Sequence, residues 1–266
     1  MVQLLRDCSA EMNEVKTSVW RQFVLVSGNF FFRFRNALFP VTFAVLFLLT
    51  RPALFLGNQT LDSIIVMLGI LVALAGQVFR LLVIGYAYIK RGGKEGKVYA
   101  DDLVVRGFYA HTRNPMYVGN FLITVGLSLV YGSPWVYFFV IPFFSFVYLS
   151  IVMAEETYLR GKFGREYEEY ERRADRFWPN FRGIGDSLKE FQYDWRRALR
   201  KDYGTVFGLM FGILFIKAWK AYFIFGFAEK KSELFVFGLL LIPAIVFYSV
   251  IRYLKLSGKL VSPSGD

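Results

Sequence analysis

The chain has 266 residues, of which 55% are hydrophobic and 19% aromatic, and its formal net charge is +11. Soluble domains average about 45–50% apolar residues. Here the excess is concentrated in runs of about 20 residues, the length that crosses a bilayer core of roughly 30 Å. This pattern argues against a soluble nucleic-acid-binding protein. It predicts an all-α, polytopic transmembrane bundle of about six spans, with basic residues between the spans.

Residues 1–35 are predicted to form a cytosolic or interfacial segment. Met1–Lys16 is polar and predicted to be helical. Val19–Phe34 is rich in aromatic residues but also carries Arg21 and Arg33, which suits a helix lying in the membrane interface. The alternative is a disordered tail followed by an early first span.

Residues 36–181 are predicted to form a core of four spans and a cytosolic helix. The spans are expected at Ala37–Phe55, Leu61–Tyr88, Pro115–Tyr131 and Pro134–Ala154, with a kink at Pro142. Lys90–Arg113 is expected to be a basic loop. Arg80, near the inner end of the second span, either snorkels to the interface or points into a cavity.

The cytosolic helix of this core is predicted at Glu155–Arg173, with an interruption at Phe163-Gly164. Residues 182–266 are predicted to form a linker and a two-span extension. A polar linker, Asp175–Leu199, leads to spans at Gly204–Phe225 and Leu234–Tyr253.

The predicted spans also set the topology. Lys217 and Lys220 are expected to snorkel to the far interface. Six spans put both termini on one side, and the basic segments predict that this side is the cytosol. A bacterial inner membrane is the expected location.

One stretch between the second and third spans carries signals for chemistry. Asn114-Pro115 is a helix start, in which Asn114 is expected to cap backbone N–H groups and Pro115 to take the first helical position. The positive end of this helix would then face the cytosol and favour an anion. Gly119 and Gly126 share a face that allows close approach of a helix or a ligand. The alternative is a well-capped transmembrane helix beside a snorkelling Arg113.

Two adjacent carboxylates, Glu155 and Glu156, lie at the inner end of the fourth span. Carboxylates in this position are costly unless solvated or paired. Arg80, Arg113 and a cationic part of a ligand are the expected partners, and a helix simply emerging into water is the alternative.

Tyr167 and Tyr170 share one face of the helix that follows, next to Arg173. This face is expected either to lie on the membrane surface or to cover a site.

The two stretches together resemble a known family. Gly107–Gly119 reads Gly-Phe-Tyr-Ala-His-Thr-Arg-Asn-Pro-Met-Tyr-Val-Gly. It resembles the Arg-His/Asn-Pro-x-Tyr-x-Gly motif of integral-membrane methyltransferases, the isoprenylcysteine carboxyl methyltransferases and their phospholipid N-methyltransferase relatives. Glu155–Pro179 resembles the second motif of that family. The resemblance covers roughly Gly69–Pro179. Phe108, Asn114 and Ala174-Asp175 depart from the commonest pattern and leave the acceptor open.

The resemblance implies that S-adenosylmethionine binds at the cytosolic face and that a lipid-like or lipid-linked acceptor enters from the bilayer. The residues that would bind the cofactor are Arg113, Asn114, Pro115, Tyr117, Gly119, Glu155 and Glu156. The expected catalytic residues are Arg113, Glu156 and His111, and the expected substrate contacts are Arg80, Tyr109 and Arg173. Because the chain has one histidine and one cysteine, no metal site is expected.

The acceptor group decides what else the site needs. A carboxylate acceptor needs only a cation to orient it, and Arg113 or Arg80 could supply this. An amine acceptor must lose a proton, to His111 or to a glutamate. Two other functions compatible with the sequence are a membrane reductase of the sterol-reductase type that uses NADPH, and a non-catalytic lipid-binding scaffold.

Overall fold

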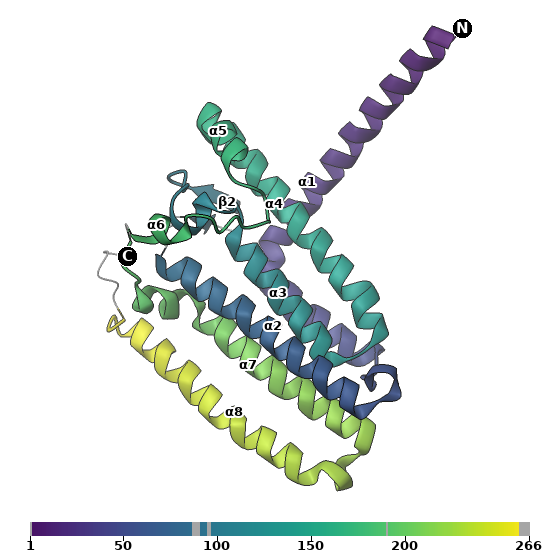
Figure 1. The fold of residues 1–266 in the computed structure, drawn as a ribbon, viewed down its shortest axis with the longest axis vertical. Coiled ribbons are helices and arrows are strands. Elements are labelled where there is room, and N and C mark those ends of the chain that lie inside the picture. Colours follow the sequence, from purple (N-terminus) through teal and green to yellow (C-terminus); the bar gives the residue numbers. More distant parts are fainter. Residues whose placement is uncertain (1, 87–90, 95–96, 190, 261–266) are drawn as a thin grey trace.

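The computed structural model describes residues 2–86, 91–94, 97–189 and 191–260, and its long helices form one bundle (Figure 1). The helices pack in the order α1, α4, α3, α2, α7, α8. Their bounds are Val2–Leu49 (α1), Gln59–Tyr86 (α2), Pro115–Tyr131 (α3), Ile141–Phe163 (α4), Trp195–Phe225 (α7) and Phe227–Leu256 (α8). Short connections at one end are the 3₁₀ turn η1 (Phe55–Gly57) and the π-helical turn η3 (Val136–Val140).

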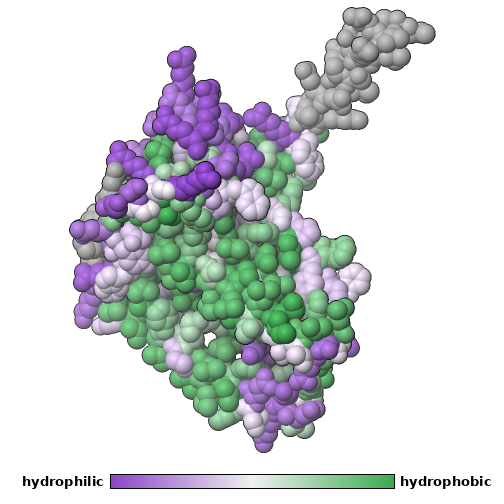
Figure 2. All heavy atoms as spheres, viewed as in Figure 1, coloured by the Kyte–Doolittle hydropathy of each residue, from purple (hydrophilic) through white to green (hydrophobic). Residues whose placement is uncertain are grey.

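The bundle confirms the prediction of a helical membrane protein with about six spans. Within the described residues, four helices are long and apolar enough to cross a membrane: Gln59–Tyr86, Val136–Phe163, Trp195–Phe225 and Phe227–Leu256. The bent α1 can supply a fifth passage, and α3 is a shorter apolar helix of 17 residues. Figure 2 shows the corresponding surface, a hydrophobic band between hydrophilic ends.

The first predicted span differs from the structure. A helix runs from Val2 to Leu49 and is bent by 93° between Ser18–Arg35 and Pro40–Leu49. Pro40 explains the bend, because its ring excludes a regular helical turn before it. The helix ends at Leu49 rather than at Phe55, since the residue before Pro52 is disfavoured in helical geometry.

The segment that was expected at the interface packs on α4 along one face. Val24 and Phe32 are buried there. A Cβ at Gly28 would lie closer to the carbonyl of Ser150 than any real contact allows, so the two helices touch at backbone distance. Trp20 and other aromatic side chains on the opposite face are exposed. This apolar face suits contact with lipid.

Helices α2 and α3 approach closely along a seam of glycines. A Cβ at Gly69 would lie 2.7 Å from the carbonyl oxygen of Gly126, and one at Gly76 would lie 2.7 Å from that of Gly119. The two pairs show that the helices run antiparallel. The glycine face predicted from Gly119 and Gly126 is therefore confirmed as a helix–helix contact.

Helix α7 is held against α2 by two buried ion pairs. Arg80 pairs with Asp202 at one end, and Lys220 Nζ lies 2.7 Å from Asp62 at the other. The paired residues are 18 positions apart on both helices, which corresponds to about 27 Å of helix. The prediction that Lys220 snorkels to the far interface is therefore wrong, because a buried carboxylate lies within its reach. Helix α7 is part of the bundle.

The end of the bundle nearest Arg80 carries most of the short elements, and we call it the polar cap. It holds the antiparallel strands β1 (Arg91–Lys94) and β2 (Lys97–Ala100), the 3₁₀ turn η2 (Gly107–Ala110), and the helices α5 (Arg165–Arg173) and α6 (Ile184–Lys189). The basic loop predicted at residues 90–113 thus contains a hairpin and a turn, while Lys90 lies outside the described residues. The linker predicted at residues 175–199 contains α6 and the start of α7, where the side chain of Asp194 caps the helix.

Candidate active site

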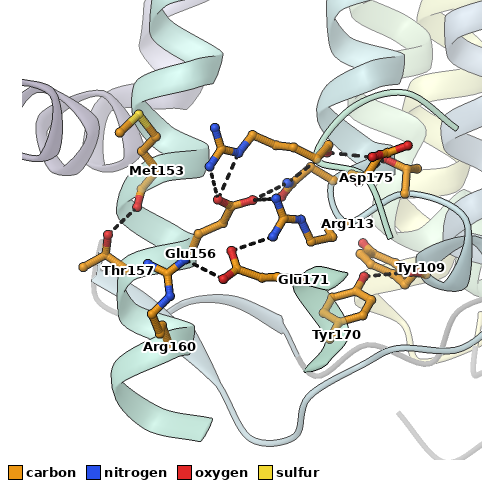
Figure 3. A network of polar contacts seen from close by, with 12 residues as sticks. Tyr109, Arg113, Met153, Glu156, Thr157, Arg160, Tyr170, Glu171 and Asp175 are labelled. Carbon is orange, nitrogen blue, oxygen red and sulfur yellow. Dashed lines mark hydrogen bonds and ion pairs between the residues drawn. The ribbon is translucent and has the colours of Figure 1, made fainter. Parts of the chain in front are cut away.

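The Arg113-Asn114 step meets Glu156 at the polar cap (Figure 3). Asn114 Nδ2 lies 3.3 Å from Glu156 Oε1, and Arg113 Nη2 lies 3.4 Å from the same oxygen. The other carboxylate oxygen accepts from Arg176 Nε at 3.0 Å and Nη2 at 2.8 Å. Glu156 is only 3% exposed. A carboxylate this deeply buried requires such partners, and it joins the start of α3 to α4 and to the segment after α5.

A second carboxylate, Glu171 on α5, extends this network. Arg113 Nη1 and Arg160 Nη2 each lie 2.5 Å from one of its oxygens. Burial alone would raise the pKa of Glu171, but hydrogen bonds and charge from Arg160 and Arg113 hold it below its ordinary value. Glu171 therefore stays ionised at neutral pH and anchors α5 over the site.

Backbone contacts fix the segment that carries Arg113. The hydroxyl of Tyr170 donates to the carbonyl of Tyr109 at 2.7 Å, and the N–H of Arg113 donates to the carbonyl of Asp175 at 2.8 Å. Tyr167 and Tyr170 are both buried. Of the two alternatives for this tyrosine face, the structure has it covering the motif segment rather than lying on the membrane surface.

The neighbouring glutamate has a different environment. The hydroxyl of Tyr117, one turn into α3, donates to Glu155 Oε1 at 2.8 Å. Glu155 and Tyr117 line a partly open cavity of about 1290 Å³, whereas Glu156 is not among its lining residues. Adjacent residues on a helix point about 100° apart, so only one of the two carboxylates faces the cavity.

The cavity is polar at the cap and apolar toward the other end of the bundle. Its polar lining includes Arg35, Arg80, Arg113, Asn114, Tyr117, Asn120, Glu155, Arg197, Lys201 and Asp202. Aromatic rings close the apolar end, where the Phe47 centroid lies 4.9 Å from that of Phe215 and 5.6 Å from that of Trp219. The shape and polarity suit an amphiphilic ligand.

Helix α7 completes the cavity wall. Arg80 points into the bundle and forms hydrogen bonds with Asp202 and Asn120. Gln77 donates to Asp202 at 2.6 Å, and Asp202 is 1% exposed. The question of whether Arg80 snorkels is thereby settled: it lies in the cavity wall, paired with a residue from the extension.

The remaining predicted site residues divide into two groups. Pro115 occupies the first turn of α3 as expected, and Tyr109 lines the cavity. Asn114 makes no side-chain cap on α3, and its Nδ2 group donates to Glu156 and to the carbonyl of Arg176. Gly119 serves the contact with α2, where its Cβ would lie 3.0 Å from the carbonyl oxygen of Gly76.

The other two predicted residues lie away from the cavity. His111 contacts the carbonyl of Asn180 through Nδ1 and the hydroxyl of Ser187 through Nε2, at 2.9 Å for the latter. Both ring nitrogens are thus engaged within the cap. Arg173 has a 79% exposed side chain and pairs with Glu169 at 3.8 Å.

Sequence reasoning did not find several residues that build the site. Glu171, Arg176 and Asp202 supply the partners of Arg113, Glu156 and Arg80. A signal for Asp202 was present, since an intramembrane arginine requires a counter-charge and Asp202 is an acid within a basic segment. Glu171 and Arg176 lie in runs of charged residues in which no single position stands out.

Comparison with known proteins identifies the central part of the chain. Residues 64–166 match the model of the phospholipid methyltransferase family. Comparison with curated proteins and with solved structures gives no significant match. The matched residues contain most of α2, all of α3, the Arg113-Asn114 step and both glutamates. The match supports a membrane methyltransferase, and the family resemblance indicated by the sequence is confirmed over residues 64–166.

Proposed function

We propose that the protein transfers a methyl group from S-adenosylmethionine to an amphiphilic or lipid-linked acceptor held in the cavity. The observation that carries this proposal is the cavity itself. Its polar end is lined by Arg113, Asn114, Tyr117 and Glu155, which the family resemblance implies as cofactor residues, and its other end is apolar. A methyl donor and a lipid-like acceptor need such a pair of neighbouring environments.

The groups at the polar end fit the cofactor chemically. S-adenosylmethionine carries a carboxylate, an amino group, ribose hydroxyls and a sulfonium cation. Among the described residues, the Nε of Arg113 is buried without a hydrogen-bond partner, and a carboxylate would satisfy it. The Glu155 carboxylate suits the amino group or the ribose hydroxyls. Glu156, outside the lining, would act by positioning Arg113 and Asn114.

The volume supports two ligands. Sites for one drug-sized molecule typically measure about 300–1,000 Å³. The cavity of about 1290 Å³ exceeds that range. It leaves room for a cofactor near Glu155 and for an acceptor whose apolar part extends toward Phe47 and Phe215.

The reaction requires little from the protein beyond orientation and exclusion of water. When bound, the cofactor supplies an electrophilic methyl group on a sulfonium. This methyl group would pass to a lone pair of the acceptor, and the electron pair of the carbon–sulfur bond would remain on sulfur. The cavity would hold the two in line, and positioning of this kind supplies a large part of the rate.

Proton transfer depends on the acceptor. A carboxylate loses no proton, and Arg113 would orient it. An amine must release one, and Glu155, hydrogen-bonded to Tyr117, is the carboxylate in the cavity that is suited to take it. His111 is unsuited to this role because both of its ring nitrogens have partners in the cap.

The charge distribution supports one orientation in the membrane. The polar cap contains Arg113, Arg160, Arg176 and neighbouring basic residues. By the positive-inside rule, the cap and both termini would face the cytosol, in the inner membrane if the source is bacterial. The cofactor would then reach its end of the cavity from the cytosol.

Methyl transfer can be tested directly on detergent-purified protein. Incubation with methyl-labelled S-adenosylmethionine and total membrane lipid should transfer label into a lipid-soluble fraction. In parallel, S-adenosylhomocysteine should raise the thermal unfolding midpoint and NADPH should not. Stabilisation by NADPH alone would support the reductase, and the absence of both stabilisation and labelling would support the scaffold.

A further inference from the structure

Helix α7 presents three glycines, four residues apart, to the cavity: Gly204, Gly208 and Gly212. A Cβ added to Gly204 or Gly208 would meet no other described atom within 4 Å outside its own stretch of helix. One added to Gly212 would touch only the side chain of Leu127, at 3.7 Å. Glycine weakens a helix relative to alanine, and these glycines make no close helix contact in return. They leave an open groove along α7.

The groove continues toward the apolar end of the cavity. Phe211 and Phe215 follow on the same side of α7, and Phe43 lines the cavity from α1. Gly204 to Phe215 spans 11 residues, which corresponds to about 16 Å of helix. The contact between Phe47 and Phe215 closes the far end. An apolar groove of this length suits a hydrocarbon chain.

The polar end of the same groove carries Lys201. Three of the other basic residues that line the cavity have carboxylate partners: Arg80 pairs with Asp202, Arg113 with Glu156 and Glu171, and Arg197 with Asp194. Lys201 lies one turn before Gly204, and no ion-pair partner of Lys201 occurs among the described residues. A cation without a carboxylate partner favours a ligand of the opposite sign.

We propose that α7 is the acceptor-binding wall: a hydrocarbon chain of an anionic amphiphile lies along Gly204, Gly208 and Gly212, with its charged head beside Lys201. This inference rests on the proposed function, since it assigns the acceptor to the α7 wall of the cavity, whereas the implied cofactor residues lie at the start of α3 and the end of α4. Helix α7 lies outside the family match. The acceptor would therefore be selected by a part of the chain that the matched core does not contain.

A photoreactive fatty acid with a diazirine near the end of its chain tests the groove without requiring turnover. After irradiation with the detergent-purified full-length chain, mass spectrometry should locate the label in residues 204–216 and in residues 43–48. Gly208→Leu should fill the groove and reduce this labelling about tenfold. Gly238→Leu is the matched control, because Gly238 is an exposed glycine of α8 that also has open space at its Cβ.

Three results would overturn the inference. The first is labelling confined to the outer face of α8, or unchanged in Gly208→Leu. The second is equal labelling by the corresponding fatty alcohol, which would remove the role of charge. The third is an altered oligomeric state of Gly208→Leu with unchanged labelling, which would assign the glycines to a contact between copies. S-adenosylhomocysteine stabilisation of the same proteins is read separately, so its absence would contradict the methyltransferase proposal and leave the groove result standing.

Discussion

Removing the carboxylate of Asp202 tests whether the ion pair with Arg80 holds α7 against α2, a helix of the part of the chain that matches the family. Asp202→Ala leaves the Arg80 guanidinium without its counter-charge and Gln77 without its acceptor. Breaking a buried ion pair by removing one partner costs about 3–5 kcal/mol. The side chain of Arg80 is 10% exposed where it borders the cavity, so water can partly solvate it. We therefore expect the lower limit, about 3 kcal/mol.

This loss should be visible in thermal unfolding. For soluble domains of comparable size, 1 kcal/mol shifts the unfolding midpoint by about 2–4 °C, so the expected decrease is roughly 6–12 °C. Circular dichroism of the protein in detergent micelles measures it. Asp186→Ala is the control, since Asp186 pairs with Lys189 on the surface and both side chains are more than three-quarters exposed. Exposed pairs contribute little, and the midpoint should not move.

The double variant Arg80→Met/Asp202→Ala distinguishes pairing from a general intolerance of substitution. It buries no uncompensated charge, so it should recover most of the stability lost in Asp202→Ala. If the double variant is as unstable as the sum of the two single variants, or if Asp202→Ala matches Asp186→Ala, the ion pair does not bind α7 to the core.

Three further predictions concern the core and the cap. Gly126→Ala should lower stability by about 1–3 kcal/mol, because the new Cβ would lie 2.5 Å from backbone atoms of α2. Gly161→Ala is the control: its new Cβ would have open space, so it should be neutral or stabilising in the same unfolding assay. The pKa of Glu171 is lowered in the folded protein, so its ionised carboxylate stabilises the fold above pH 4.5, the ordinary pKa of the group. This stabilisation is lost as the pH falls below 4.5. The difference in unfolding midpoint between wild type and Glu171→Gln should therefore disappear in acid, and a difference independent of pH would contradict the assignment. Glu156→Ala should abolish binding of S-adenosylhomocysteine, because Arg113 and Asn114 lose the carboxylate that positions them. Calorimetric titration measures this, and normal binding by the variant would show that Glu156 is not part of the site.

Local signals predicted the parts of the fold that depend on neighbouring residues. Pro115 and the left-handed Gly132 define both ends of α3, which the sequence predicted correctly. Gly164, also at positive φ, separates α4 from α5 where a break was expected. The bend in α1 was missed because a long apolar run on either side of Pro40 reads equally well as two separate helices.

Long-range pairs explain what the sequence could not supply. Arg80 and Asp202 are separated by 122 positions, and Lys220 and Asp62 by 158, so only the folded bundle shows that they meet. The twin glutamates were predicted as one unit. The helix turns between them, which directs Glu155 into the cavity and Glu156 into the cap. The cap predicted for Asn114 is also absent, and its side chain instead contacts Glu156, a residue 42 positions away.

Calorimetric titration of S-adenosylhomocysteine into wild type, Glu155→Gln and Glu166→Gln tests the central claim, that the start of α3 and the end of α4 enclose a cofactor site. Glu155 borders the cavity and Glu166 is an exposed residue of α5. We expect binding by wild type and by Glu166→Gln, and at least about tenfold weaker binding by Glu155→Gln, which corresponds to about 1.4 kcal/mol. Equal affinity of all three proteins, or no binding by wild type, would contradict the claim.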